Sequence, residues 1–153
     1  MVLNAPSAAV APRVMDYGLL DISPGMFPAA ARQGDTIVLS YSTVPDGWPG
    51  GQVRVTRSED GGCTWSDSEV AATPRADEDA VLGAHGMTFL SDGRLLLPVN
   101  TIRWAGAGVG DRVAGLRLLE SQDAGRSWTD IDLSVDFAWP AVYGTFLESG
   151  DRL

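Results

Sequence analysis

The chain has 153 residues, 44% of them hydrophobic and 20% charged, which is typical of a globular chain of about one domain and excludes an intrinsically disordered one. All 11 basic residues are Arg, they form no basic run, and the formal net charge is −9. We therefore expect no nucleic-acid partner and no binding to an anionic membrane surface. No apolar run reaches the ~20 residues that a membrane span requires.

The chain has one cysteine, Cys63, and one histidine, His85. A single cysteine excludes an intrachain disulfide and a Cys-rich metal site, so Cys63 is either a small turn residue or, with a base nearby, a nucleophile. We expect neither a metal nor another cofactor. Residues 1–14 are rich in Ala, Val and Pro but lack a basic start, so they make a poor signal peptide and leave the compartment open.

An internal repeat organises the chain. The segment PAAARQGDTI, starting at position 28, aligns with GMTFLSDGRL, starting at 86, and with GTFLESGDRL, starting at 144. The copies are therefore 58 residues apart, and Thr36, Arg94 and Arg152 share one column. Each copy places a glycine–aspartate pair between two apolar runs, which predicts a tight hairpin.

The repeat divides the chain into a lead-in segment and three units, each built of short strands. Residues 1–26 are the lead-in, or a strand of a preceding unit. We predict strands in the first unit (27–74) at 28–33, 36–42, 52–57 and 66–72. We predict strands in the second unit (75–135) at 87–91, 94–100, 112–120 and 129–133. Loops are predicted at 43–51 and 101–111, and a lead-in loop at 75–87. The third unit (136–153) ends two residues into its second strand.

Four antiparallel strands in nearly sixty residues predict an all-β fold, a β-propeller of four-stranded blades that is here incomplete, with about two and a half blades. An unclosed propeller exposes an inter-blade face. We therefore expect the chain to be a fragment, and self-association of that fragment is the alternative.

A second repeat lies within the first two units. The segments SEDGGCTW, at 58–65, and SQDAGRSW, at 121–128, share the pattern S-x-D-x-G-x-[ST]-W. The aspartate can accept hydrogen bonds from backbone N–H groups, the glycine can take positive φ, and the indole N–H can find a carbonyl. These are structural tasks, and the residues that we assign to them are Ser58, Asp60, Gly62, Thr64, Trp65, Ser121, Asp123, Gly125, Ser127 and Trp128.

This pattern resembles the Asp box, or bacterial neuraminidase repeat, of the sialidase superfamily, and the resemblance covers about residues 27–153. It implies a six-bladed propeller with the boxes on the turn between the third and fourth strands, away from the active site. It also implies an Arg-Ile-Pro element on the first inner strand, whose arginine binds the substrate carboxylate. Here Met26-Phe27-Pro28 stands in that place, so Met26 replaces the arginine. The family's Tyr–Glu nucleophile pair is expected later than this sequence reaches.

The resemblance also implies an acid/base aspartate in the loop after the second strand, and Asp46 of TVPDGWPGGQ occupies that loop. Trp48 can supply an apolar wall that raises the pKa of a carboxyl group. The alternative for Asp46 is an ordinary Pro-Asp-Gly turn.

Four further residues are candidates for substrate binding. His85 lies at the entry to the second inner strand, where it either faces a ligand or makes structural hydrogen bonds. Arg103 and Trp104 form a pair that suits a sugar ring, or an ordinary exposed loop. Tyr143 begins the third inner strand and can line the central pocket.

Three functions remain open from the sequence. The first is a sialidase-like glycoside hydrolase acting on terminal sialic acid or a related sugar. The second is a non-catalytic Asp-box propeller that binds glycans or proteins, which the loss of the arginine at Met26 favours. The third is a hydrolase or lyase for a sugar without a carboxylate.

Overall fold

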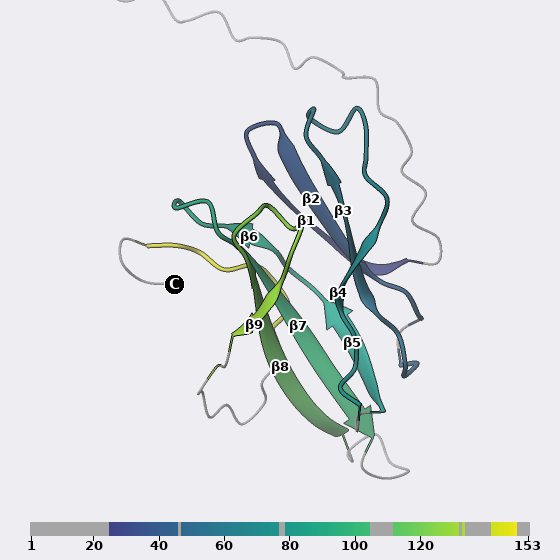
Figure 1. Cartoon of the computed structure of the whole chain (residues 1–153). Helices are drawn as coiled ribbons and strands as arrows, with labels where there is room; N and C mark the ends of the chain where they lie inside the picture. Colours follow the sequence, from purple (N-terminus) through teal and green to yellow (C-terminus); the bar gives the residue numbers. More distant parts are fainter. Residues whose placement is uncertain are drawn as a thin grey trace, which may run out of the picture.

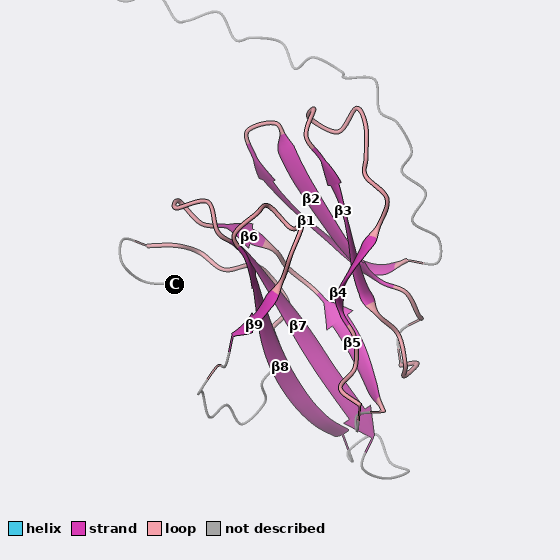
Figure 2. Cartoon of the chain, viewed as in Figure 1, coloured by secondary structure: helices cyan, strands magenta, loops and turns pink. Residues whose placement is uncertain are grey.

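The computed structural model describes residues 25–45, 47–76, 79–104, 112–131, 133 and 142–149. All regular elements among these residues are β-strands, and they form two antiparallel sheets (Figures 1 and 2). The described part of the chain therefore has no helix that is long and apolar enough to cross a membrane.

The first sheet follows chain order. It contains β1 (Met26–Gln33), β2 (Thr36–Ser42), β3 (Val53–Ser58) and β4 (Glu69–Ala72), each hydrogen-bonded to the next. The four predicted strands are confirmed within a few residues. Gly34, with φ of 60°, makes the tight turn between β1 and β2.

The second sheet contains β5 (Ala80–Ala84), β6 (Thr88–Phe89), β7 (Leu95–Trp104), β8 (Arg112–Ser121) and β9 (Thr129–Ile131). Its order is β5-β7-β8-β9, and β6 also pairs with β7. The second hairpin, the third strand and the fourth strand are confirmed.

Two loop predictions in this sheet are wrong. Residues 80–84 and 101–104 were predicted as parts of loops, but they form β5 and the end of β7, paired from Ala80 opposite Arg103 to Ala84 opposite Val99. All five residues of β5 are buried, so this strand lacks the alternation of polar and apolar residues that identifies a half-exposed strand.

The apolar core lies between the two sheets and continues beyond the second. Leu95, Leu97 and Val99 project from one face of β7 into a cluster shared with Val38 and Val53 of the first sheet. The opposite face carries Leu96, which packs with Leu90 and Leu118. Phe146 of the third unit lies against this second cluster, so the second sheet has neighbours on both faces.

The start of the third unit does not form the predicted inner strand. Residues 142–148 have no regular strand structure, and Ser149 makes only an isolated bridge. The segment is nevertheless held on the second sheet by side-chain hydrogen bonds. Thr145 Oγ1 donates to Met87 O at 2.8 Å, and Glu148 accepts from Ser91 N and Oγ at 2.7 and 2.9 Å.

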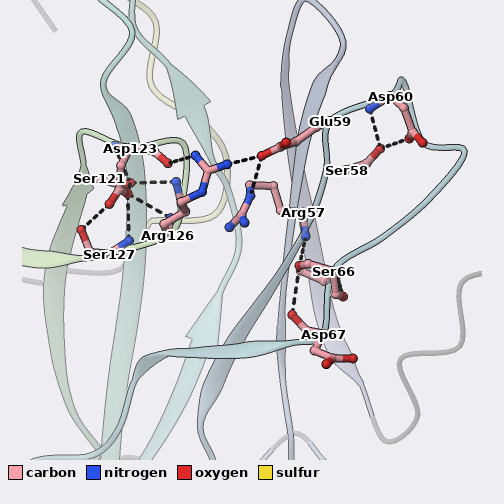
Figure 3. A network of polar contacts seen from close by, with 12 residues as sticks. Arg57, Ser58, Glu59, Asp60, Ser66, Asp67, Ser121, Asp123, Arg126 and Ser127 are labelled. Atoms are coloured by element: carbon pink, nitrogen blue, oxygen red, sulfur yellow. Dashed lines mark hydrogen bonds and ion pairs between the residues drawn. The ribbon is translucent and has the colours of Figure 1, made fainter.

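The two S-x-D-x-G-x-[ST]-W turns share one pattern of hydrogen bonds around the aspartate, and Figure 3 shows the serine–aspartate contact of each. In the first, Ser58 Oγ donates to Asp60 Oδ1 at 2.8 Å, and Thr64 donates its N–H to Asp60 Oδ1 at 2.8 Å and its Oγ1 hydroxyl to Oδ2 at 2.6 Å. In the second, Ser121 Oγ and Ser127 N donate to Asp123 Oδ1 at 2.8 Å, and Ser127 Oγ donates to Oδ2 at 2.6 Å. Each aspartate therefore holds its turn closed.

Hydrogen bonding lowers the pKa of both aspartates. Donors from the Thr64 side chain and backbone and from Ser58 lower the pKa of Asp60 from 3.8 to about 2. Desolvation acts to raise the pKa of Asp123, but donors from Ser127 and Ser121 outweigh it and hold this pKa at about 2.

The turns also connect the sheets. Arg126 of the second turn forms an ion pair with Glu59 of the first, and Arg57 Nε lies 3.5 Å from the same carboxylate (Figure 3). Glu59 therefore links the ends of β3 and β8.

The two tryptophans of the turns differ. Trp65 Nε1 donates to Gly62 O at 3.1 Å, as predicted. Trp128 Nε1 is buried and has no hydrogen-bond partner among the described residues, so the prediction is wrong there. The Trp128 ring packs against the core between the sheets.

Core packing predicts the effect of truncating Leu97, which is fully buried between the sheets. We expect Leu97→Ala to lower the free energy of unfolding by about 2–5 kcal/mol, because it leaves a cavity that the core cannot fill. Leu147→Ala is the matched control, since Leu147 is 81% exposed. Urea unfolding followed by tryptophan fluorescence measures both, and equal midpoints for the two variants would contradict this account of the core.

The low pKa of Asp60 and Asp123 predicts a pH dependence of stability. Because the folded pKa of about 2 lies below the ordinary value of 3.8, the stabilisation is complete above about pH 4 and is lost as the pH falls toward 2. We expect the double variant Asp60→Asn, Asp123→Asn to be less stable at pH 7 but to lose less stability between pH 4 and 2. Urea midpoints across this range test it. Asp35→Asn, on an exposed hairpin turn, is the control and should keep the wild-type slope.

Candidate functional site

Three aromatic rings from successive repeats meet at one edge of the two sheets. Phe27 of β1 lies 4.5 Å from His85, centroid to centroid, and His85 lies 4.6 Å from Tyr143, with an interplanar angle of 51° in both pairs. The three residues are 58 positions apart, so they occupy the same position in the three copies of the repeat. Tilted contacts at these distances are favourable aromatic geometry.

An irregularity in each inner strand positions the first two rings. In β1, Met26 pairs with Ser42 and Ala29 with Ser40, so β1 contains one residue more than the stretch that it faces. In the second sheet, Ala84 pairs with Val99 and Thr88 with Leu96, so the chain from Ala84 to Thr88 likewise has one residue more than the stretch of β7 that it faces. Such bulges bend a strand and redirect its side chains.

Phe27 also has a strained backbone. Its φ is 53°, in the left-handed region that residues other than glycine rarely adopt. This conformation costs about 1–3 kcal/mol and is often found at functional sites. Because it occurs at the bulge, the strain and the redirected aromatic ring belong to the same feature of β1.

The rings surround a small cavity of about 70 Å³. Its lining comes from all three repeats and consists of Phe27, Val81, Gly83, His85, Asn100, Ile102 and Tyr143. Gly83 leaves room for the histidine, since a Cβ atom there would lie 2.7 Å from His85 Nε2. The cavity admits a few water molecules or a substituent, but it is far smaller than the ~300 Å³ of ordinary ligand pockets. A larger ligand would lie over the Tyr143 ring, because this residue is 68% exposed.

Glycine also allows the third repeat to approach the second. A Cβ atom at Gly86 would lie 1.7 Å from Gly144 O, so any larger side chain at Gly86 would displace the backbone beside Tyr143. The contact between the His85 and Tyr143 rings depends on this close approach.

The sequence-predicted site residues fall into two groups. His85 and Tyr143 share the cavity, but Arg103 does not reach it. Arg103 and Thr101 line a separate cavity of about 150 Å³, whereas Asn100 and Ile102 of the same strand line the aromatic one. Alternation along β7 directs these two pairs of side chains to opposite faces of the sheet.

The loop that contains Trp48 is attached to β5 opposite Arg103. Trp48 is 65% exposed in this loop after β2, and Gly50 N of the loop donates to Ala80 O at 3.3 Å. Ala80 in turn lies opposite Arg103 and lines the same cavity. Asp46 lies outside the described residues, as does the side chain of Trp104.

Met26 lies beside the aromatic site, where the family resemblance implies an arginine. It is 37% exposed and pairs with Ser42. The lining of the aromatic cavity contains no arginine, so the described residues provide no guanidinium there for a carboxylate. Cys63 is exposed in the first turn, and no group of His, Cys, Asp and Glu within the described ranges could hold a metal ion.

Sequence reasoning missed Phe27 and Asn100 as parts of this site. The signal was present, because the 58-residue offset that aligned the hairpins also aligns Phe27, His85 and Tyr143. The bulges that bring these side chains together depend on strand pairing and have no local sequence signature.

No protein-family model matches the sequence, and no curated protein matches it. Solved structures do match the fold. An unknown function protein from Dyadobacter fermentans DSM 18053 superimposes with a TM-score of 0.60 at 18% identity, over 84% of this chain and 44% of its own. The Hadza microbial sialidase Hz136 superimposes with a TM-score of 0.57 at 20% identity, over 70% of this chain and 25% of its own.

The chain thus spans less than half the length of either structure. At this level of identity the likeness shows a common fold, and the chain shares an antiparallel all-β architecture with part of a sialidase.

Proposed function

We propose that this chain is part of a sialidase-like glycoside hydrolase, and that its two sheets and residues 142–149 belong to successive blades of a β-propeller. The proposed blades are 27–74 and 75–135, with a third that begins at 136. The observation that carries the proposal is the meeting of three repeat-equivalent rings at one edge of the sheets. In a propeller, equivalent positions on inner strands face the central axis, where ligands bind.

The aromatic site suits a sugar. An exposed aromatic face such as that of Tyr143 can pack against the apolar face of a pyranose ring. The cavity of about 70 Å³ below it can take a single substituent of that ring. His85 lines the cavity and has the chemistry to bind a hydroxyl group.

The proposed acid/base is Asp46. Its loop is constrained, because Thr43 N donates to Gln52 O at 3.0 Å and Trp48 N donates to Pro45 O at 3.1 Å. A carboxyl group beside the Trp48 indole would have its pKa raised by desolvation, which is what a general acid needs near neutral pH. Sialidases use a tyrosine nucleophile with such a carboxyl group, and we expect the nucleophile to come from outside this sequence.

Met26 favours a second candidate function. Recognition of the sialic acid carboxylate calls for a bidentate guanidinium, which the thioether of Met26 cannot provide. A site lined by three rings and an amide, without a described arginine, suits a neutral sugar. The second candidate is therefore a propeller that hydrolyses or only binds a sugar without a carboxylate.

Hydrolysis of fluorogenic glycosides by the full-length protein, of which we propose this chain to be a part, tests these proposals. We expect turnover of a 4-methylumbelliferyl sialoside, and we expect Asp46→Asn to lower kcat/KM about 10²–10⁴-fold through loss of general acid catalysis. Asp67→Asn, at an exposed position between β3 and β4, is the matched control and should retain activity.

The remaining outcomes separate the candidates. Turnover of neutral glycosides alone would replace the sialidase proposal with the neutral-sugar hydrolase. Glycan binding without turnover of any glycoside would support the non-catalytic alternative. Unchanged sialoside hydrolysis in Asp46→Asn would exclude Asp46 as the acid.

A further inference from the structure

Ser42 and Asn100 occupy the same position in successive repeats, 58 residues apart; Ser42 is the last residue of β2, and Asn100 lies within β7. Both side chains are almost fully buried, and both are hydrogen-bonded to the backbone of the following repeat. Ser42 Oγ donates to Leu82 O at 2.8 Å. Asn100 Nδ2 donates to Val142 O at 2.9 Å, and Asn100 Oδ1 accepts from Val142 N at 2.8 Å.

The Asn100 amide contacts Val142 in the same way as a neighbouring strand would. It satisfies both backbone polar groups of one residue, as an opposite residue does in a hydrogen-bonded antiparallel pair. This matters because residues 142–148 form no strand of their own. The residue that follows Val142 is Tyr143, whose ring lies on His85.

We propose that Asn100 is a positioning residue of the aromatic site: its amide fixes the backbone at Val142 and thereby seats the Tyr143 ring on His85. The importance of this seating for a sugar ligand rests on the proposed function. The seating itself depends only on this chain.

Other contacts keep the third segment on the second sheet without Asn100. Thr145 Oγ1 donates to Met87 O at 2.8 Å, Phe146 N donates to Thr88 Oγ1 at 3.1 Å, and Glu148 binds Ser91. The Phe146 side chain packs on the apolar cluster around Leu96. Loss of the Asn100 amide should therefore free residues 142 and 143 while residues 145–148 stay docked.

The chemistry of asparagine is specific to this position. A buried aspartate would keep an acceptor for Val142 N but lose the donor to Val142 O, and it would carry a charge into a site that is 1% exposed. An aliphatic residue would leave both backbone groups without partners. Serine, the residue at the equivalent position of the first repeat, can replace only one of the two hydrogen bonds.

The test uses His85, the one histidine of the chain, whose ring signals in a ¹H–¹³C NMR spectrum identify themselves. The ring current of the neighbouring Tyr143 shifts these signals, and Tyr143→Leu removes that shift. We expect Asn100→Ala to change the chemical shift of the His85 signals by half or more of the change seen in Tyr143→Leu. Asn100→Ser should change it less than Asn100→Ala does. The double variant should move the signal no further than Tyr143→Leu alone.

Two further variants separate positioning from general destabilisation. Thr56→Val removes another buried hydrogen bond, from Thr56 Oγ1 to Ser66 O at 2.7 Å in the first sheet, and should leave the His85 signal unmoved. Gly86→Ala forces the Gly144 backbone, next to Tyr143, away from the second sheet and should also move the signal. If Asn100→Ala leaves the signal in place while Tyr143→Leu moves it, the proposal is overturned.

An additive shift in the double variant would also overturn it, because Asn100 would then act by a route other than Tyr143. The measurement needs no ligand. A protein without glycosidase activity or glycan binding would contradict the proposed function and leave this result standing.

Discussion

The fold depends on burial of both faces of the second sheet. Leu95, Leu97 and Val99 on one face of β7 and Leu96 on the other are all 1% exposed or less. A four-stranded unit cannot bury two apolar faces by itself, so the second sheet needs a neighbour on either side. The first sheet covers one face, and the segment around Phe146 contributes to the cover of the other. The dependence of one unit on the next is thus a consequence of hydrophobic burial.

Stacking of equivalent units determines where side chains from different repeats meet. Residues at equivalent positions of successive repeats lie next to one another, which is why Phe27, His85 and Tyr143 come together although they are 58 positions apart. The same geometry places Ser42 and Asn100 against the backbone of the following repeat. The position of Phe27, His85 and Tyr143 supplies the rings. The position of Ser42 and Asn100 supplies the hydrogen bonds to the backbone of the following repeat.

The sequence predicts features that local chemistry determines. Both hairpins, the outer strands and the aspartate turns follow from turn residues and short-range patterns, and they lie where the structure has them. The sequence does not reveal β5 or the end of β7, because a strand that is buried on both sides has no alternation and is recognised only by its partner. Of the three rings around the cavity, His85 and Tyr143 were predicted from the sequence as candidates for substrate binding, but Phe27 was not. Arg103 was expected in a loop, but β7 continues through it, and alternation along that strand directs its side chain to the other face of the sheet.

The structure also separates two kinds of carboxyl group. Asp60 and Asp123 accept three or more hydrogen bonds each, which keeps them ionised and leaves them no proton to give near neutral pH. Their role is to close the turns at one end of the sheets, and the Arg126–Glu59 ion pair joins those turns. General acid chemistry requires the opposite environment, a carboxyl group beside apolar surface with few donors. Among the described residues, the loop after β2 offers apolar surface in the exposed Trp48 indole, and its attachment to β5 lies at the far end of the sheets from the turns. The environment of Asp60 and Asp123, as well as their position, therefore identifies them as structural acids and not as general acids.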